Sequence, residues 1–212
     1  MSLVVNAFDR FKSMLYSTME FSLGLIGIDT YRLATRAHAL YCLATIDGGT
    51  IDRYMKSYIL FDGDWSNDNG KSEDSIVDYY QVINHLCALG NVEKMYIPPL
   101  RDPNVSLTRN QELFELKMME DIGAFGAKRV LDVGCGRGRV AMHTAKVTKA
   151  HVSGINIDPS QIANAQHYAP RLGLAETTDF QVSSLNDRLP FDDETFDAAY
   201  EIQAFTYCKD KV

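Results

Sequence analysis

The stretch Val130-Leu-Asp-Val-Gly-Cys-Gly-Arg-Gly-Arg139 decides the fold of this chain. A short apolar run leads into three closely spaced glycines, and a helix-forming segment begins directly after them. Glycine lets the backbone turn sharply and lets a ligand lie against it, while the first N–H groups of the helix point at that ligand. This strand–loop–helix pattern predicts a ligand-binding unit of an α/β domain.

The spacing of the glycines indicates which kind of ligand this loop holds. The dinucleotide fingerprint G-x-G-x-x-G requires a glycine at position 139, where this chain has Arg139. The spacing here is G-x-G-x-G, and Asp132 lies two residues before the first glycine. An acid at that point suits a ligand that carries an ammonium group better than it suits a pyrophosphate.

Short apolar runs alternate with helical segments from Arg129 onward. We expect strands over 129–133, 151–157, 179–182 and 196–202, and helices over 140–147 and 159–169. This alternation predicts a parallel sheet with right-handed crossovers. The expected fold class is therefore α/β, with an incomplete sheet of about four parallel strands.

The residues before this unit predict a mainly helical front half. Residues 7–45 carry apolar side chains at helical spacing, and turn formers and acids fill 61–74. Further helices are expected from about 75 to 86 and over 108–122. The predicted domains are a helical N-terminal extension (1–60), a lid or substrate-side segment (61–126), and a Rossmann-like domain (127–212).

The composition excludes several classes of protein and partner. Hydrophobic residues make up 46% and charged residues 23% of the 212 residues, as in globular proteins. The formal charge of −7, from 21 basic and 28 acidic residues, argues against nucleic acid as a partner. The four cysteines and five histidines are scattered, so neither a disulfide framework nor a metal site is expected, and a cytoplasmic location fits best.

An early apolar run, Phe21–Ile28, is far too short to span a bilayer. Two interpretations of the helices around it stay open. They pack on the main domain, or they rest one face on the surface of an intracellular membrane.

Three successive segments resemble the motifs of class I S-adenosylmethionine-dependent methyltransferases: 130–139, 154–165 and 189–200. Within that class the chain is most similar to the sterol 24-C-methyltransferase group. The residues that carry this resemblance are Gly154-Ile-Asn running into Gln161-Ile162, the Leu-Pro-Phe turn at 189–191, and Asp78-Tyr79-Tyr80. The resemblance implies S-adenosyl-L-methionine as cofactor and a small-molecule substrate, a sterol-like or isoprenoid lipid.

The resemblance also implies roles for individual residues. Asp132 and the loop glycines would cradle the methionine part of the cofactor, and Asn156 stands where the class usually places an acid that holds the ribose hydroxyls. Asp158 is either a contact to ribose or adenine, or the N-cap of a helix with Pro159 and Gln161 after it. The expected cofactor-binding residues are Asp132, Gly134, Gly136, Gly138, Asn156, Asp158, Gln161, Ser184, Asn186 and Gln203, with Asp187 as a further candidate for adenine.

The candidate catalytic residues are Glu201, Tyr207 and Tyr80. Gln203 and Tyr207 occupy the positions of a glutamate and a histidine in the sterol enzymes, a departure on the acceptor side of the site. The tyrosine pair at 79–80 is equally consistent with ordinary helix core. Two other functions stay open: O- or N-methylation of a soluble metabolite, and a non-catalytic cofactor-binding module.

The resemblance bears on the length as well. The methyltransferase-like portion starts near residue 127, and the family pattern expects further strands after the fourth. We therefore expect a C-terminally truncated methyltransferase, with one sheet edge left uncovered.

Overall fold

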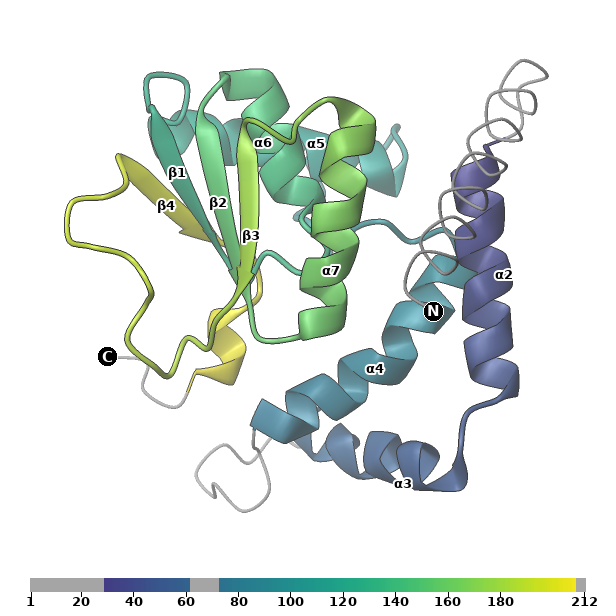
Figure 1. The fold of residues 1–212 in the computed structure, drawn as a ribbon. Helices are drawn as coiled ribbons and strands as arrows, with labels where there is room; N and C mark the ends of the chain where they lie inside the picture. The colour runs from purple at the N-terminus through teal and green to yellow at the C-terminus, as the bar shows by residue number, and fades with distance from the viewer. Residues whose placement is uncertain (1–28, 62–72, 209–212) are drawn as a thin grey trace, which may run out of the picture.

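A parallel sheet at the centre of the fold is flanked by helices, as the computed structural model shows for residues 29–61 and 73–208 (Figure 1). The sheet has four strands in the order β3-β2-β1-β4, and all neighbouring pairs are parallel. The strands are β1 (Arg129–Val133), β2 (His151–Asn156), β3 (Thr178–Val182) and β4 (Ala198–Glu201). This arrangement confirms the predicted α/β class and the four parallel strands.

The two faces of the sheet are covered differently. Helices α6 (Arg139–Thr148) and α7 (Pro159–Tyr168) pack on one face, where side chains such as Val130 and Val152 form the main core. On the other face, Leu131 and its neighbours meet apolar side chains from the segment between β3 and β4. These side chains belong to Leu185, Leu189, Phe191 and Phe196.

Strand β4 is shorter than the predicted range 196–202. The carboxylate of Asp197 accepts hydrogen bonds from the backbone N–H groups of Lys128 and Arg129, at 2.7 and 2.9 Å. This side chain occupies the donors at the start of β1, and Phe196 packs in the cluster on the second face. The paired register with β1 begins at Ala198, and before it the backbone N–H of Asp197 donates to the carbonyl oxygen of Arg129 at 2.9 Å.

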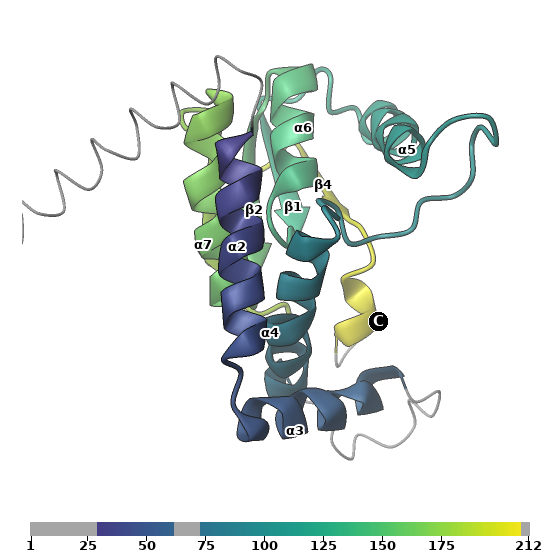
Figure 2. The same ribbon diagram turned by 90° about the vertical axis from the view of Figure 1, so that its right-hand side faces the viewer.

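The front helices form a group of their own beside the sheet. Helix α2 (Thr30–Ala44) lies along α4 (Glu73–Leu89), and α3 (Gly48–Ser57) crosses below them (Figure 2). Asp29 and Asp47 cap α2 and α3 by accepting from backbone N–H groups. No helix in 29–61 or 73–208 is long and apolar enough to cross a membrane. The helices expected before residue 29 and the turn-rich segment over 62–72 lie outside the described residues.

The remaining elements complete the walls around the sheet. Helix α5 (Leu107–Asp121) is capped by Ser106 and packs against α6. Short 3-10 helices are η1 (Tyr58–Phe61), η2 (Ala169–Leu172) and η3 (Phe205–Tyr207). The division into three domains stays a prediction.

Candidate functional site

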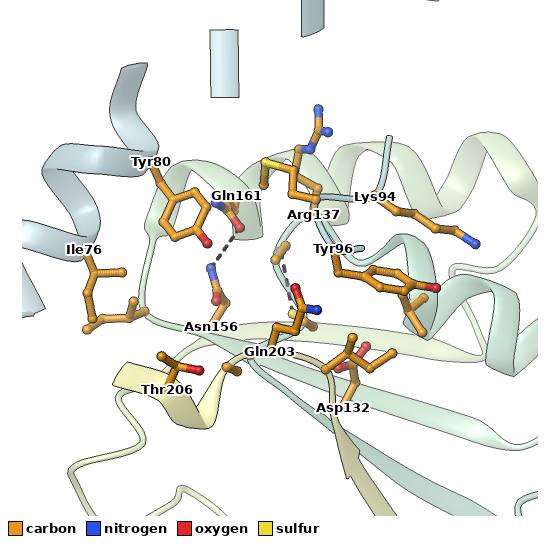
Figure 3. A pocket seen from close by; sticks show the side chains of 18 of the residues that line it. Ile76, Tyr80, Lys94, Tyr96, Asp132, Arg137, Asn156, Gln161, Gln203 and Thr206 are labelled. Carbon is orange, nitrogen blue, oxygen red and sulfur yellow. Dashed lines mark hydrogen bonds between the residues drawn. The ribbon is translucent and has the colours of Figure 1, made fainter. Parts of the chain in front are cut away.

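A cavity of about 590 Å³ opens at the carboxyl ends of the strands. The glycine loop after β1 and the residues that follow β2, β3 and β4 line one side of it. Helix α4 and the segment 92–97 line the others (Figure 3). Crevices at this edge of a parallel sheet are where open α/β folds bind ligands.

Asp132 is a buried carboxyl group in the lining of this cavity. Its Oδ2 accepts a hydrogen bond of 3.0 Å from the hydroxyl of Tyr200. Burial raises the pKa of Asp132 to about 7; the Tyr200 hydrogen bond opposes this rise and the charge of Glu115 adds to it. A cationic group placed beside this carboxyl group would favour its ionised form.

The three loop glycines occupy two different environments. Gly134 and Gly136 line the cavity in left-handed backbone conformations, with φ of 76° and 54°. Gly138 does not line it. A Cβ at Gly138 would lie 2.7 Å from the ring of Phe180, so this glycine allows α6 to pack closely on the sheet.

A chain of amides links α4 to the end of β2. Asn156 and Gln161 both line the cavity, and Asn156 Nδ2 donates to Gln161 Oε1 at 3.2 Å (Figure 3). Gln161 Nε2 donates to Asn84 Oδ1 at 3.2 Å, and Asn84 Nδ2 donates to Asp158 Oδ2 at 3.1 Å. Asp158 is buried outside the cavity and caps α7 through the N–H of Ser160. Of its two interpretations, the structure shows the N-cap.

Ser184 and Asn186 line the cavity near the end of β3, and Asp187 does not. Ser184 Oγ and Asn186 Nδ2 both donate to Glu73 Oε1, at 2.5 and 2.7 Å. Glu73 is the first residue of α4, so this helix contacts the residues expected to hold adenine as well as those expected to hold ribose.

The three candidate catalytic residues lie in different places. Tyr80, on α4, lines the cavity (Figure 3). Glu201 does not line it, because its carboxylate accepts from the backbone N–H groups of Ala204 and Phe205, at 2.7 and 3.1 Å, and so holds the turn after β4. The side chain of Tyr207 lies outside the described residues. Gln203 lines the cavity, and its amide donates to the carbonyl of Ile97.

The segment 92–97, which lies within the predicted lid or substrate-side segment 61–126, forms a wall of the cavity. Lys94 and Tyr96 line the cavity, and a fully buried carboxylate on α5, Glu115, anchors both of them. Lys94 Nζ lies 2.7 Å from both of its oxygens, the Tyr96 hydroxyl donates to it, and His143 Nδ1 lies 2.5 Å away. These partners outweigh burial, which alone would raise its pKa, and the pKa of Glu115 falls below its ordinary value.

The two loop arginines differ in their surroundings. Arg139 pairs with Glu93 at 2.7 Å and stacks over the ring of Tyr168. Arg137 is buried rather than solvated and donates to the backbone carbonyls of Val92 and Glu93. Both side chains therefore fasten the 92–97 wall to the glycine loop.

This sheet order, the glycine loop at its centre and the acid before that loop define a class of protein. The domain formed by residues 130–212 is a class I S-adenosylmethionine-dependent methyltransferase domain. The same residues match the family model described as "Methyltransferase domain".

Individual relatives sharpen this assignment. The chain is 40% identical over 87 residues to sterol 24-C-methyltransferase ERG6B of Gibberella zeae, a match that covers 41% of this chain and 23% of that protein. It is 28% identical over 162 residues to cycloartenol-C-24-methyltransferase 1 of Oryza sativa subsp. japonica, covering 76% of this chain and 46% of the relative. The chain thus spans 23% and 46% of the length of these two relatives, and its resemblance to the sterol methyltransferases is confirmed.

The solved structures include a similar fold in the [4+2]-cyclase SpnF. Its TM-score is 0.55 at 25% sequence identity, and the match covers 60% of this chain and 48% of that one.

Proposed function

We propose that this chain transfers the methyl group of S-adenosylmethionine to a carbon atom of an apolar small molecule, a sterol-like or isoprenoid lipid. The observation that carries this proposal is the composition of the cavity. Its floor is the glycine loop with the buried Asp132, and its α4 side is a wall of aromatic and aliphatic side chains. The similarity to sterol and cycloartenol methyltransferases supports the same substrate class.

The lining residues fit the parts of this cofactor. We assign Asp132 to the ammonium group of the cofactor, because a nearby positive charge would favour the ionised form of its buried carboxyl group. Gly134 and Gly136, which have no Cβ, let the ligand approach the backbone closely. Asn156, at the end of β2, offers an amide to the ribose hydroxyls, and the residues around Ser184 offer polar groups to adenine.

The acceptor would bind against the aromatic wall. The ring of Tyr79 packs against Phe61 and Tyr80, with centroid distances of 5.0 and 5.2 Å, and all three residues line the cavity together with Ile76 and Ile83. Such a wall binds an apolar molecule by burying its surface. Aromatic faces also stabilise a positive charge on the acceptor, which arises when an alkene is methylated.

The mechanism assigns this chain mainly the tasks of alignment and exclusion of water. The cofactor supplies a methyl group already activated on a sulfonium, so no further activation by the protein is required. The glycine loop and Asp132 would hold the methyl donor, and the aromatic wall would hold the acceptor and exclude water from it. Methylation of an alkene then requires a base to remove a proton, and Tyr80 is the candidate base that lines the cavity.

Binding and transfer need separate measurements, because the similar fold of SpnF belongs to a protein described as a cyclase. Calorimetry of the chain with S-adenosylhomocysteine measures binding. Incubation with cofactor labelled in the methyl group, together with lipid or aqueous cell extract, measures transfer. We expect label in the lipid products of the wild-type chain and none with Asp132→Asn. Label only in aqueous products would refute a lipid acceptor, and binding without any transfer would identify a non-catalytic cofactor-binding module.

A lipid acceptor makes contact with a membrane surface part of this proposal. Large apolar side chains on α2 and α3 are exposed, among them Leu40, Tyr41 and Met55, at 60%, 66% and 60%. Such side chains can insert at the boundary between headgroups and acyl chains. Sedimentation with phosphatidylcholine vesicles tests this contact, and we expect Met55→Lys to reduce the bound fraction.

A further inference from the structure

Asn84 and Gln161 connect Asn156 to the buried carboxylate of Asp158 by consecutive hydrogen bonds. We propose that this connection fixes the direction of the Asn156 amide, so that its carbonyl oxygen is the group presented to the ribose hydroxyls of the cofactor. Asn84 is then a positioning residue of the cofactor site, although it lies on α4 and does not line the cavity. The inference rests on the proposed function.

Asp158 determines which end of each amide donates and which end accepts. Both of its carboxylate oxygens accept: Oδ1 from the backbone N–H of Ser160 at 2.8 Å, and Oδ2 from the side chain of Asn84 at 3.1 Å. An ionised carboxylate can only accept hydrogen bonds. Asn84 must therefore turn its NH2 group toward Asp158. This orientation follows from the chemistry of the carboxylate and needs no choice between the two ends of the amide.

The orientation of each amide fixes the orientation of the next amide in the connection. Because the NH2 group of Asn84 donates to Asp158, the carbonyl oxygen of Asn84 faces Gln161. Gln161 must therefore donate to this oxygen from its own NH2 group, at 3.2 Å. The carbonyl oxygen of Gln161 then faces Asn156, which donates from Nδ2 at 3.2 Å. The remaining polar atom of Asn156 is its carbonyl oxygen Oδ1, on a residue that lines the cavity.

This direction matters because an amide is ambiguous toward a diol. In dinucleotide-binding α/β folds an acid at the end of the second strand accepts a hydrogen bond from the ribose. An asparagine at that place could turn either its carbonyl oxygen or its NH2 group toward the hydroxyls. The buried acid at position 158 lies two residues beyond Asn156 and selects the accepting end through two amides. The chain thereby retains an acceptor for ribose without a charge in the cavity at that position.

The test compares two ligands, S-adenosylhomocysteine and its 2′-deoxy analogue, by calorimetry on the 212-residue chain. For the wild type we expect an affinity ratio of about tenfold in favour of the ligand with the hydroxyl, the usual effect of one hydrogen bond in a partly buried site. Asn84→Leu, which can neither donate nor accept, should lower the ratio to less than about twofold. Gln161→Leu breaks the same connection one step closer to Asn156 and should have the same effect.

Two further variants separate positioning from general damage. In Asn84→Asp the new carboxylate still accepts from Gln161 while it repels Asp158, so the affinity ratio should stay near the wild-type value although the melting temperature falls. Gln81→Leu changes an exposed residue on the same helix and should leave the ratio unchanged. Melting curves establish that each variant is folded before binding is measured.

The outcomes distinguish this inference from the function on which it rests. An unchanged affinity ratio in folded Asn84→Leu and Gln161→Leu would overturn the positioning role of Asn84 and leave the methyltransferase proposal intact. Equal losses of affinity for both ligands would also overturn the positioning role of Asn84, because a merely structural effect lowers the affinity for both ligands alike. If the wild-type chain bound neither ligand, the proposed function itself would fail.

Discussion

Asp132 couples the stability of this fold to pH in a direction that is unusual for a carboxyl group. Its pKa is raised from the ordinary 3.8 to about 7 in the folded chain, chiefly by burial. Between these two values the folded protein holds a proton that the unfolded chain releases. The free energy of unfolding therefore falls as pH rises through this window, and the effect is complete above pH 7. Asp132→Asn removes the titrating group.

The size of the effect follows from the same two values. A difference of about 3 pKa units at 1.36 kcal/mol each gives about 4 kcal/mol, the change expected between pH 4 and pH 8. The amide introduced by Asp132→Asn has no proton to lose, so the variant should gain stability relative to the wild type by this amount as the pH rises over the same range. An uncharged amide in the same place also keeps an acceptor for the hydroxyl of Tyr200.

Urea unfolding of both proteins at a series of pH values measures this difference directly. Asp193→Asn, which changes an exposed acid in the segment between β3 and β4, is the matched control and should show no such trend. A difference between Asp132→Asn and wild type that does not change with pH would refute the assignment of the raised pKa to Asp132.

Cofactor binding should be linked to the same proton. If the ammonium group of S-adenosylhomocysteine pairs with Asp132, it favours the ionised carboxylate, and binding below pH 7 must release a proton. Calorimetry at pH 6.5 in two buffers of different ionisation enthalpy counts that proton. The release should vanish in Asp132→Asn, and proton uptake by the wild type would contradict the placement of the ammonium group.

Two further predictions concern the frame of the site, and urea unfolding measures both. Gly138→Ala should cost about 3 kcal/mol, because its left-handed φ of 71° is strained for alanine and the new Cβ would press against the ring of Phe180. Gly123→Ala, with a φ of 70° and no atom near the new Cβ, should cost only about 1 kcal/mol. Equal losses would show that the ring moves away freely. Glu115→Gln should cost about 3–5 kcal/mol because it leaves the largely buried ammonium group of Lys94 without its counter-charge. Glu112→Gln, at a partly exposed position of the same helix, should cost less than about 1 kcal/mol. A small loss at Glu115 would mean that the amide satisfies the lysine.

The sheet was predictable because its signals are local. Apolar runs bounded by glycine or turn residues gave β1 at its observed bounds and placed α6 and α7 within a residue or two. The start of β4 was the exception. Its first residues were expected in the ladder, but Asp197 satisfies the N–H groups of Lys128 and Arg129 instead. No local pattern indicates a side chain that replaces a strand bond across 68 or 69 positions of sequence.

The site was predictable mainly where its residues lie near the end of a strand or in the helix after it, and Tyr80 on α4 is an exception. Asp132 and Asn156 stand at strand ends and line the cavity, as the motif spacing indicated. Glu201 also stands at a strand end, yet it turns away because the backbone N–H groups of the next turn offer it partners. The contacts of Asn84 with Gln161 and of Glu73 with Asn186 join residues 77 and 113 positions apart, so no spacing rule could reveal them.

Helix α4 has a single face that serves both halves of the proposed reaction. Residues three or four positions apart share one face of a helix. On α4 this rule aligns the hydrogen-bonding residues Glu73 and Asn84 with the cavity-lining residues Ile76, Tyr80 and Ile83. The side chains that orient the nucleoside partners and the wall proposed to bind the acceptor are therefore parts of one rigid element. A substitution that shifts α4 to accommodate a different acceptor must also move Asn84 relative to Gln161. Changes of acceptor specificity along this face should consequently change the affinity for the cofactor as well.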